Sequence, residues 1–415
     1  MSRLEELIAE LCPEGVEYKT LGEIATDVFR GSGIKREQVM ETGIPCVRYG
    51  EIYTTYDIWF DHCVSHTNES LITNPKYFGY GDILFAITGE SVEDIAKSCA
   101  YVGHEKCLAG GDIVVLKHHE NPKYLSYALA TEAARKQKRA GKVKSKVVHS
   151  SVPAIKEIRI PVPPLPVQGE IVRILDNFTE LTAELTAELT ARKKQYEYYR
   201  DLLLSHDNKC EKVQLDKISK FTYGYTDKAK DTGNTRFVRI TDIDDDGCLK
   251  SDGAKYINLS DESKKYLLHR GDLLLARTGA TYGKTLYYPD DNPAIYASFL
   301  IKLTLDNDRI LNRYYWHFSK SSLYWTQAEK LVSKGGQPQF NSNAVGRIVV
   351  PIPSLDIQEK IVYVLDHFNA ICSDLKIGLP AEIEARKKQY EYYRDQLLTF
   401  AESGRMLVDR QTDRM

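Results

Sequence analysis

The sequence lacks several features that would assign it to a class at once. It has no apolar run of about 18 residues, the least that crosses a bilayer, and its first residues do not form a signal peptide. Its eight cysteines form no Cys-x-x-Cys pair, which indicates reduced thiols rather than disulfides or a metal site. The formal net charge is only −2, so bulk charge does not indicate nucleic-acid binding. These absences predict a cytoplasmic protein, and 415 residues allow two or three domains.

Motifs of common enzyme classes are also missing. Gly31-Ser-Gly33 lacks the third glycine of a dinucleotide-binding loop. Asn74-Pro-Lys-Tyr77 and Asn121-Pro-Lys-Tyr124 resemble the Asn-Pro-Pro-Tyr motif of amino-methyltransferases, but both lack the second proline and no glycine-rich methyl-donor motif accompanies them. The acidic run at 242–247 opens like a calcium loop, yet its twelfth position is a glycine instead of glutamate. We therefore predict no catalytic residue, no metal site and no cofactor in this chain.

One eleven-residue segment occurs twice without a change. The segment Ala-Arg-Lys-Lys-Gln-Tyr-Glu-Tyr-Tyr-Arg-Asp spans 191–201 and 385–395, 194 positions apart. Related proline-rich runs precede the copies at 161–168 and 351–358, which are 190 positions apart. The second copy therefore carries four extra residues, about one helical turn. The chain is an internal duplication.

Each copy predicts a long helix with a narrow apolar seam. Apolar residues recur at spacings of three and four, as in a coiled coil; they include Leu175, Phe178, Leu185, Leu189, Tyr196 and Tyr199 in the first helix and Leu365, Phe368, Leu375, Tyr390 and Tyr393 in the second. Pairing the two seams with each other, antiparallel, is the simplest way to bury them. The alternative is two separate bundle helices that never meet. Gly378 and Pro380 predict an interruption in the second helix.

The segments before these helices have short β-type runs broken by glycine, asparagine and proline, and a helix is expected over 124–138. We predict an α+β fold in which two globular domains alternate with two long antiparallel coiled-coil helices, a tandem repeat with pseudo-two-fold symmetry. The predicted parts are an N-terminal helix (1–15), a first domain (16–160), a first helix (161–209), a second domain (210–350), a second helix (351–403) and a tail (404–415).

The two domains have the same residues at a set of matched positions, but their sequences differ widely between these positions. This pattern favours two domains that perform one task on two different targets. The alternative is a purely structural duplication. A basic run ends the first domain, and its counterpart in the second domain carries lysine and glutamines. Lysine neutralises phosphates and glutamine can bond an adenine edge, although many charge runs are only solvated helix ends. Three further loops recur at matched positions. The candidate DNA contacts are Arg30, Lys35, Arg36, Arg48, Tyr49, Thr88, Lys142, Lys144 and Lys146 in the first domain and Tyr225, Lys228, Arg239, Arg277, Lys284, Lys334, Gln337 and Gln339 in the second.

Taken together, these features resemble the specificity subunit of Type I restriction-modification systems. The resemblance rests on Pro-x-Pro-x-Leu-x-x-Gln-x-x-Ile at 161–171 and 351–361, the Gly-Asp-Ile/Leu-Leu…Thr-Gly runs that begin at Gly81 and Gly271, and the paired identical segments. It covers essentially the whole chain. The repeated tetrapeptide at 182–189 (Thr-Ala-Glu-Leu, twice) adds to it, because some family members use such repeats to set the distance between domains.

The resemblance implies a DNA-binding subunit without a catalytic centre. In such proteins each target recognition domain reads one half of a bipartite, asymmetric sequence, and the helices set the spacer and dock two modification subunits. S-adenosylmethionine, ATP and Mg²⁺ are then expected on the modification (methyltransferase) and restriction (endonuclease and translocase) subunits. Two alternatives stay open: a coiled-coil scaffold with two protein-binding globular ends, and a stand-alone DNA adenine methyltransferase.

Overall fold

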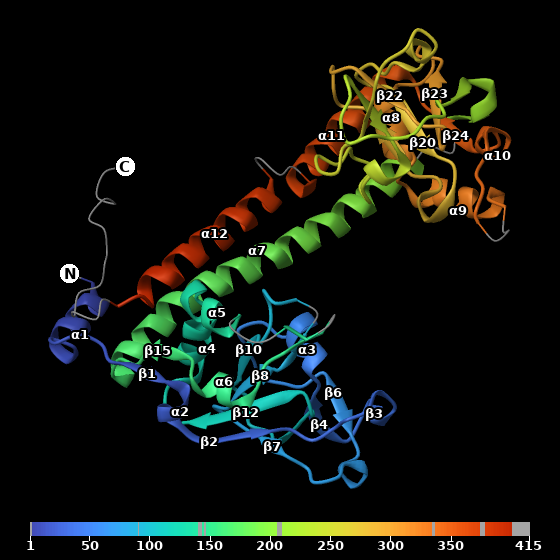
Figure 1. Cartoon of the computed structure of the whole chain (residues 1–415). Helices are drawn as coiled ribbons and strands as arrows, with labels where there is room; N and C mark the ends of the chain where they lie inside the picture. The colour runs from blue at the N-terminus through green and yellow to red at the C-terminus, as the bar shows by residue number, and fades with distance from the viewer. Residues whose placement is uncertain are drawn as a thin grey trace. The chain divides into compact units, whose positions relative to one another are not determined.

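A computed structural model describes residues 2–89, 91–139, 143–144, 147–205, 210–333, 337–373 and 378–400 (Figure 1). The chain divides into two compact units. Unit 1 comprises residues 1–184 and 383–415, and unit 2 comprises residues 185–382. Each unit thus contains one globular domain and parts of both long helical regions.

The domain of unit 1 is built on two five-stranded sheets. One has the order β2-β12-β8-β10-β5 and the other β3-β6-β4-β11-β7. All residues of β8 and β10 are buried, which explains the continuous apolar sequence of β8. The strands are β1 (Tyr18–Thr20), β2 (Ala25–Arg30), β3 (Val39–Met40), β4 (Ile44–Val47), β5 (Trp59–Phe60), β6 (Ser65–Thr67), β7 (Tyr77–Phe78), β8 (Ile83–Ala86), β9 (Thr88–Gly89), β10 (Ser98–Tyr101), β11 (Cys107–Ala109), β12 (Ile113–His118), β13 (Val143–Lys144), β14 (Val147–His149) and β15 (Arg159–Pro161).

Short helices surround these sheets: α1 (Arg3–Leu11), α2 (Leu21–Ile24), α3 (Tyr49–Thr54), α4 (Pro122–Ala130), α5 (Glu132–Lys138) and α6 (Val152–Lys156), with 3-10 turns η1 (Arg36–Gln38) and η2 (Glu69–Leu71). The single helix expected over 124–138 is wrong. The Thr131 side chain accepts the backbone N–H of Ala134 at 3.3 Å, so it ends α4 and caps α5.

The domain of unit 2 repeats this order with a four-stranded sheet, β17-β23-β20-β21, and a three-stranded sheet, β19-β18-β22. Its strands are β16 (Glu211–Gln214), β17 (Ser219–Tyr223), β18 (Thr235–Val238), β19 (Tyr256–Ile257), β20 (Leu273–Ala276), β21 (Thr285–Tyr287), β22 (Ala294–Tyr296), β23 (Leu300–Leu305) and β24 (Val349–Ile352). Its helices and turns are α8 (Asn312–Phe318), α9 (Ser322–Leu331), α10 (Ser342–Gly346), η3 (Leu215–Lys217), η4 (Ile240–Asp242), η5 (Ser263–Tyr266) and η6 (Gly279–Thr281).

The duplication is visible in individual hydrogen bonds. The Tyr124 hydroxyl donates to the Pro161 carbonyl at 2.9 Å, and the Tyr314 hydroxyl donates to the Pro351 carbonyl at 3.0 Å. Both members of the second pair lie 190 positions beyond those of the first. The same register therefore holds from α4 to β15 in the first domain and from α8 to β24 in the second.

The first long helix, α7 (Leu165–Ser205), is continuous over 41 residues, as predicted. The second region forms two helices, α11 (Leu355–Ser373) and α12 (Leu379–Leu397), so the predicted interruption is confirmed. Pro380 is the second residue of α12, where the missing N–H costs no helical hydrogen bond.

The long helices pair in both units (Figure 1). In unit 1, Phe178 of α7 stacks on Tyr393 of α12 with ring centroids 5.4 Å apart. In unit 2, Tyr199 of α7 meets Phe368 of α11 at 5.7 Å. Phe178 corresponds to Phe368 and Tyr199 to Tyr393, so the two contacts are equivalent by the repeat. The predicted antiparallel pairing is confirmed, and the alternative of helices that never meet is wrong.

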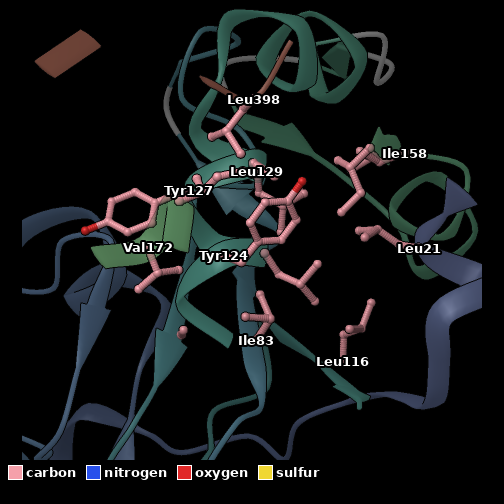
Figure 2. Close-up of a cluster of buried hydrophobic side chains, with 14 of the residues drawn as sticks. Leu21, Ile83, Leu116, Tyr124, Tyr127, Leu129, Ile158, Val172 and Leu398 are labelled. Atoms are coloured by element: carbon pink, nitrogen blue, oxygen red, sulfur yellow. The ribbon is translucent and has the colours of Figure 1, made fainter. Parts of the chain in front are cut away.

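Each helix shares a hydrophobic core with its domain. In unit 1, Tyr124 and Leu129 of α4 pack with Ile83 of β8, Val172 of α7 and Leu398 (Figure 2). The core of unit 2 likewise joins the C-terminal part of α7 and the helix α11 to helices α8 and α9. No helix in the described ranges is both long enough and apolar enough to cross a membrane.

Candidate nucleic-acid interface

Arg277 is the centre of a loop cluster in unit 2. Its backbone carbonyl accepts the N–H of Phe340 at 2.7 Å, and its Nε donates to the Ser298 carbonyl at 3.0 Å. The guanidinium carbon lies 5.2 Å from the Tyr223 ring centroid and 5.6 Å from that of Phe299. Phe299 is 51% exposed and Tyr223 is 39% exposed, so two aromatic rings flank a cation at the surface. Such a surface can stack on bases and contact phosphates.

The predicted glutamines belong to the same cluster. Gln339 forms β-bridges to Thr278 and to Ser333, and the Gly279 N–H donates to the Pro338 carbonyl at 3.1 Å. A Cβ on Gly279 would lie 3.5 Å from the Gln337 side-chain nitrogen. The structure thus brings the loop after β20 together with the segment after α9, as predicted from their matched positions.

A third loop closes the cluster. Tyr225 forms a β-bridge to Ala297, directly before the Ser298 carbonyl that holds Arg277. A Cβ on Gly224 would collide with the backbone of Ala297, so this close approach requires glycine. Lys228 is exposed beyond Tyr225.

Unit 1 has the corresponding arrangement with other side chains. Thr88 of β9 pairs with His149 of β14, and their side chains lie 3.3 Å apart. β14 pairs in turn with β13, which contains Lys144. Lys142 and Lys146, like Lys334 in unit 2, lie outside the described residues. Ser32 forms a β-bridge to Gly110, as Tyr225 does to Ala297 in unit 2.

Several predicted cations are held by carboxylates of their own domain. Arg48 Nε donates to Glu51 Oε1 at 3.0 Å, and Arg239 Nη2 donates to Asp242 Oδ1 at 2.6 Å. The same carboxylates accept the backbone N–H groups of the two arginines, which close equivalent turns. Arg30 is bound to Asp112 and Lys284 to Asp245. These side chains shape the loops, while Lys35, Arg36 and Tyr49 are exposed. Their contacts with DNA stay predictions.

The identical segments dock on equivalent helices of the two domains. In unit 2 the Tyr196 hydroxyl lies 3.1 Å from His317 Nδ1 of α8, and in unit 1 the Tyr390 ring lies 6.3 Å from that of Tyr127 of α4. Leu175 and Leu365 are fully buried, whereas Leu185 and Leu189 are partly exposed. Leu375 lies outside the described residues. The buried contacts explain why the inward residues of the two segments are identical.

A half-buried aspartate links each long helix to its domain. Asp366 accepts from Arg313 Nε at 2.7 Å and lies 2.8 Å from His317 Nε2. Asp176 makes the equivalent bonds to Lys123 and the Tyr127 hydroxyl, both at 2.7 Å. Burial lowers the pKa of His317 to about 4, so this histidine is neutral at physiological pH. The network holds helix and domain together and has no free nucleophile.

Sequence reasoning named Tyr223 only as part of a loop and missed Phe299 and His149 altogether. Tyr223 could have been found from the Tyr-Gly-Tyr pattern, because a glycine between aromatics marks a close backbone approach. Phe299 and His149 carry no such signal. Among the residues that the structure describes, no group of three histidine, cysteine or acidic side chains could hold a metal ion.

Known proteins are similar to this chain in sequence and in fold. Residues 13–192 and 208–385 each match the family described as the Type I restriction modification DNA specificity domain. A putative type I restriction enzyme specificity subunit of Haemophilus influenzae is 33% identical over 279 residues, which cover 63% of this chain and 68% of that protein. A type I restriction enzyme specificity subunit of Escherichia coli is 35% identical over 266 residues, covering 59% of this chain and 63% of that protein.

Two solved structures have the same fold. The S subunit of a Type-I restriction-modification system from M. genitalium aligns with a TM-score of 0.52 and 16% identity, covering 92% of this chain and 96% of that one. A chain from a study of complex assembly and conformational transition of the type I R-M system aligns with a TM-score of 0.59 and 15% identity, covering 93% and 98%.

Proposed function

The chain belongs to the family of the Type I restriction modification DNA specificity domain, and from this premise we propose that its two domains read the two halves of a bipartite, asymmetric site in double-stranded DNA. Sequence specificity for DNA is the task of a specificity subunit in such a system. We further propose that each domain recognises one half-site. The chain itself contributes recognition rather than catalysis.

One observation carries this proposal: the same three loops meet in both domains, but with different side chains. Unit 2 presents Arg277 between two exposed aromatic rings, and glutamines beside it. Unit 1 presents Thr88 and His149 at the equivalent place, next to a basic hairpin. A common scaffold with different contacting groups is what two readers of different base sequences need.

The helices are proposed to set the spacer and to dock two modification subunits. The identical segments support the docking, because identity extends to residues that packing does not explain. Tyr198 and Tyr392 are 64% and 57% exposed, yet they are the same residue in both copies. A surface repeated without change suits two copies of one partner. Restriction subunits would complete the complex, with S-adenosylmethionine, ATP and Mg²⁺ bound by the partner subunits.

DNA binding by the chain assembled with its modification subunits tests the proposal. We expect one duplex sequence to bind at least ~10³-fold more tightly than a random duplex, with affinity falling steeply as salt rises because phosphate contacts release counterions. The modification subunits alone serve as the control. A complex that binds all duplexes equally, or binds none, would contradict the proposal and favour a protein-binding scaffold.

A further inference from the structure

A polar pocket occurs at the same place in both domains. Its volume is about 380 Å³ in unit 1 and about 250 Å³ in unit 2. In each case the pocket lies beside the turn between two helices (α4–α5 or α8–α9) and the first residue of a strand (β10 or β21). Equivalent residues line both pockets: Lys97 and Lys284, Ser98 and Thr285, Leu129 and Ser319, Ala130 and Lys320, and Arg135 and Trp325.

A lysine side chain enters each pocket, but from a different backbone position. In unit 1 it is Lys138 of α5, whose equivalent in unit 2 is Ala328. In unit 2 it is Lys320 after α8, whose equivalent in unit 1 is Ala130. The lysine and the alanine have thus exchanged places between the two copies.

Equivalent hydrogen bonds in the two domains show which residues correspond on either side of the exchanged positions. Thr131 caps α5 and its equivalent Ser321 caps α9 through the same side-chain hydrogen bond. Gln137 accepts the backbone N–H of Arg159 at 2.8 Å, and its equivalent Gln327 accepts that of Val349 at the same distance. Lys138 and Ala328 therefore occupy equivalent backbone positions, and so do Ala130 and Lys320.

Neither ammonium group has a carboxylate partner. Lys138 Nζ donates to Ser98 Oγ at 3.0 Å and lies 5.7 Å from the Phe85 ring. Lys320 Nζ lies 3.3 Å from the Trp316 ring. Within the described part of the chain, no carboxylate oxygen lies within 4.0 Å of either nitrogen. Burial lowers the pKa of Lys138 to about 7 and that of Lys320 to about 8, although the more distant carboxylate of Asp246 acts in the opposite direction on Lys320.

A lysine without an ion pair destabilises a fold when it is removed from water; Lys138 is buried and Lys320 is half-buried, so packing does not account for a lysine in each pocket. A lysine lies in both pockets although it comes from two different backbone positions. This indicates that the positive charge in the pocket is the feature that both domains require. We propose that each pocket binds a carboxylate side chain of the modification subunit, one copy for each domain, and that this carboxylate completes the ion pair of Lys138 or Lys320. This inference rests on the proposed docking of two modification subunits.

The pocket walls favour a single carboxylate over a DNA phosphate. Each pocket has three acidic residues among its lining residues: Asp57, Glu93 and Asp94 in unit 1, and Glu197, Asp245 and Asp246 in unit 2. Because like charges repel, these walls disfavour a polyanion such as duplex DNA more strongly than one side chain.

The surroundings also indicate the same partner for both pockets. The identical segment of α7 lines the pocket of unit 2 through Lys193, Tyr196 and Arg200. In unit 1 the second identical segment lies close enough that Arg135 and Asp57 of the pocket act on the pKa of Tyr390. Each pocket is therefore next to a surface that is the same in both copies.

The test uses the full chain with purified modification subunits. Lys138→Met and Lys320→Met keep the length of the side chain and remove its charge, and the exposed lysine of Lys264→Met serves as the matched control. We expect each pocket variant to weaken one of the two binding events by at least ~30-fold, measured by titration calorimetry and native mass spectrometry. The double variant should lose both events, and the control should lose neither. Thermal unfolding should show that the variants are folded at least as stably as the parent chain.

A second variant uses the exchange itself. Lys138→Ala combined with Ala130→Lys gives unit 1 the arrangement of unit 2, and we expect it to restore binding that Lys138→Ala alone has lost. Two full-affinity binding events in the Met variants would overturn the inference. Unchanged subunit binding with weakened DNA binding would also overturn it, because the pocket would then hold a phosphate. If the parent chain bound no modification subunit, the proposed function would fail as well.

Discussion

At the scale of single residues, a buried glutamine explains why each proline-rich run ends as it does. Gln168 Oε1 accepts the Asn121 N–H at 2.9 Å, and its Nε2 donates to the Pro163 carbonyl at 2.7 Å. Gln358 makes the equivalent bonds to Leu311 and Pro353, both at 2.9 Å. One fully buried amide thus joins the proline run and the long helix to the start of α4 in unit 1 and of α8 in unit 2.

Replacing this amide should destabilise the fold. Gln358→Leu would leave the Leu311 N–H and the carbonyls of Arg309 and Pro353 without their partner. Each buried unsatisfied group costs about 1–3 kcal/mol, so we expect the free energy of unfolding of unit 2 to fall by at least ~2 kcal/mol. Urea titration followed by tryptophan fluorescence measures this. Gln214→Leu, at an exposed position of the same unit, should change the midpoint little; equal effects of both variants would contradict the argument.

Arg277 should matter for DNA rather than for folding. Arg277→Ala removes the cation between Tyr223 and Phe299, and we expect DNA affinity of the assembled complex to fall by ~10–100-fold, the range of a good base or phosphate contact. Arg270→Ala is the control, since Arg270 is bound to Asp291 at 2.7 Å on an exposed surface. Competition between duplexes altered in either half-site measures the effect. A loss of specificity for both half-sites would show that Arg277 does not act within one domain.

Lys138 predicts a pH-dependent stability. Its pKa falls from 10.5 in the unfolded chain to about 7 in the folded one, because burial disfavours the ammonium. Below pH 7 the lysine is charged in both states and destabilises the fold fully; between pH 7 and 10.5 only the unfolded chain holds the proton, so stability rises with pH. Lys138→Met should therefore stabilise the chain most in acid, and this gain should shrink as pH rises. Urea unfolding at about pH 6 and about pH 9 measures the difference, and a gain independent of pH would contradict the assignment.

At the scale of elements, the repeated tetrapeptide lies in a sparsely packed part of α7. Residues 186–188 are exposed, and Leu185 and Leu189 are only partly buried. The helix is nevertheless continuous from Leu165 to Ser205. Its length here is thus free to change without cost to either core.

Deleting residues 186–189 should shorten the recognised spacer. Four helical residues span about 6 Å, close to two base pairs. We expect both half-site sequences to be kept while the unread gap between them becomes shorter, measured by mapping methylated adenines in DNA treated with the assembled complex. Inserting one further Thr-Ala-Glu-Leu is the matched control and should lengthen the gap. An altered half-site with an unchanged gap would contradict the role of the helix as a spacer.

The long helices and the repeated domains could be predicted because their signals are periodic or duplicated. The seam of α7 follows from spacing alone, and the interruption before α12 follows from Gly378 and Pro380. The break at Thr131 was missed, because a threonine inside a helical pattern gives no sign that its hydroxyl will cap the next helix. The candidate site was predicted as loops with named side chains, but the sequence does not show which of these side chains are bound within their own domain. Nothing in the sequence shows that Arg239 bonds its own Asp242.

The identity of the two repeated segments predicted packing contacts that the structure shows in both units. The charged loops predicted DNA contacts, and these stay predictions. The inward residues of the repeated segments pack as expected, since the same partners recur in both domains. Exposed aromatics such as Phe299 were missed, because the exposure of a single apolar residue depends on tertiary packing and leaves no periodic pattern.

At the scale of the whole molecule, the chain enters and leaves each domain through two strands that pair with each other. The first strand, β1, pairs with the last, β15, with Tyr18 opposite Pro161. In the second domain β16 pairs with β24, with Lys212 opposite Pro351. Entry and exit of the chain therefore lie side by side in each unit, next to the hydrogen bonds that both copies share. A replacement domain that keeps the residues packed on the long helices can therefore be joined at these strands.

This construction predicts that specificity is modular. Exchanging residues 16–160 for the first domain of another member of the family should change one half-site and leave both the other half-site and the gap unchanged, because the second domain and the long helices are kept. Mapping of methylated adenines gives all three quantities in one measurement. The matched control exchanges residues 210–350 and should change only the other half-site. If either exchange altered both half-sites, recognition would depend on the two domains together, and the assignment of one half-site to each domain would be wrong.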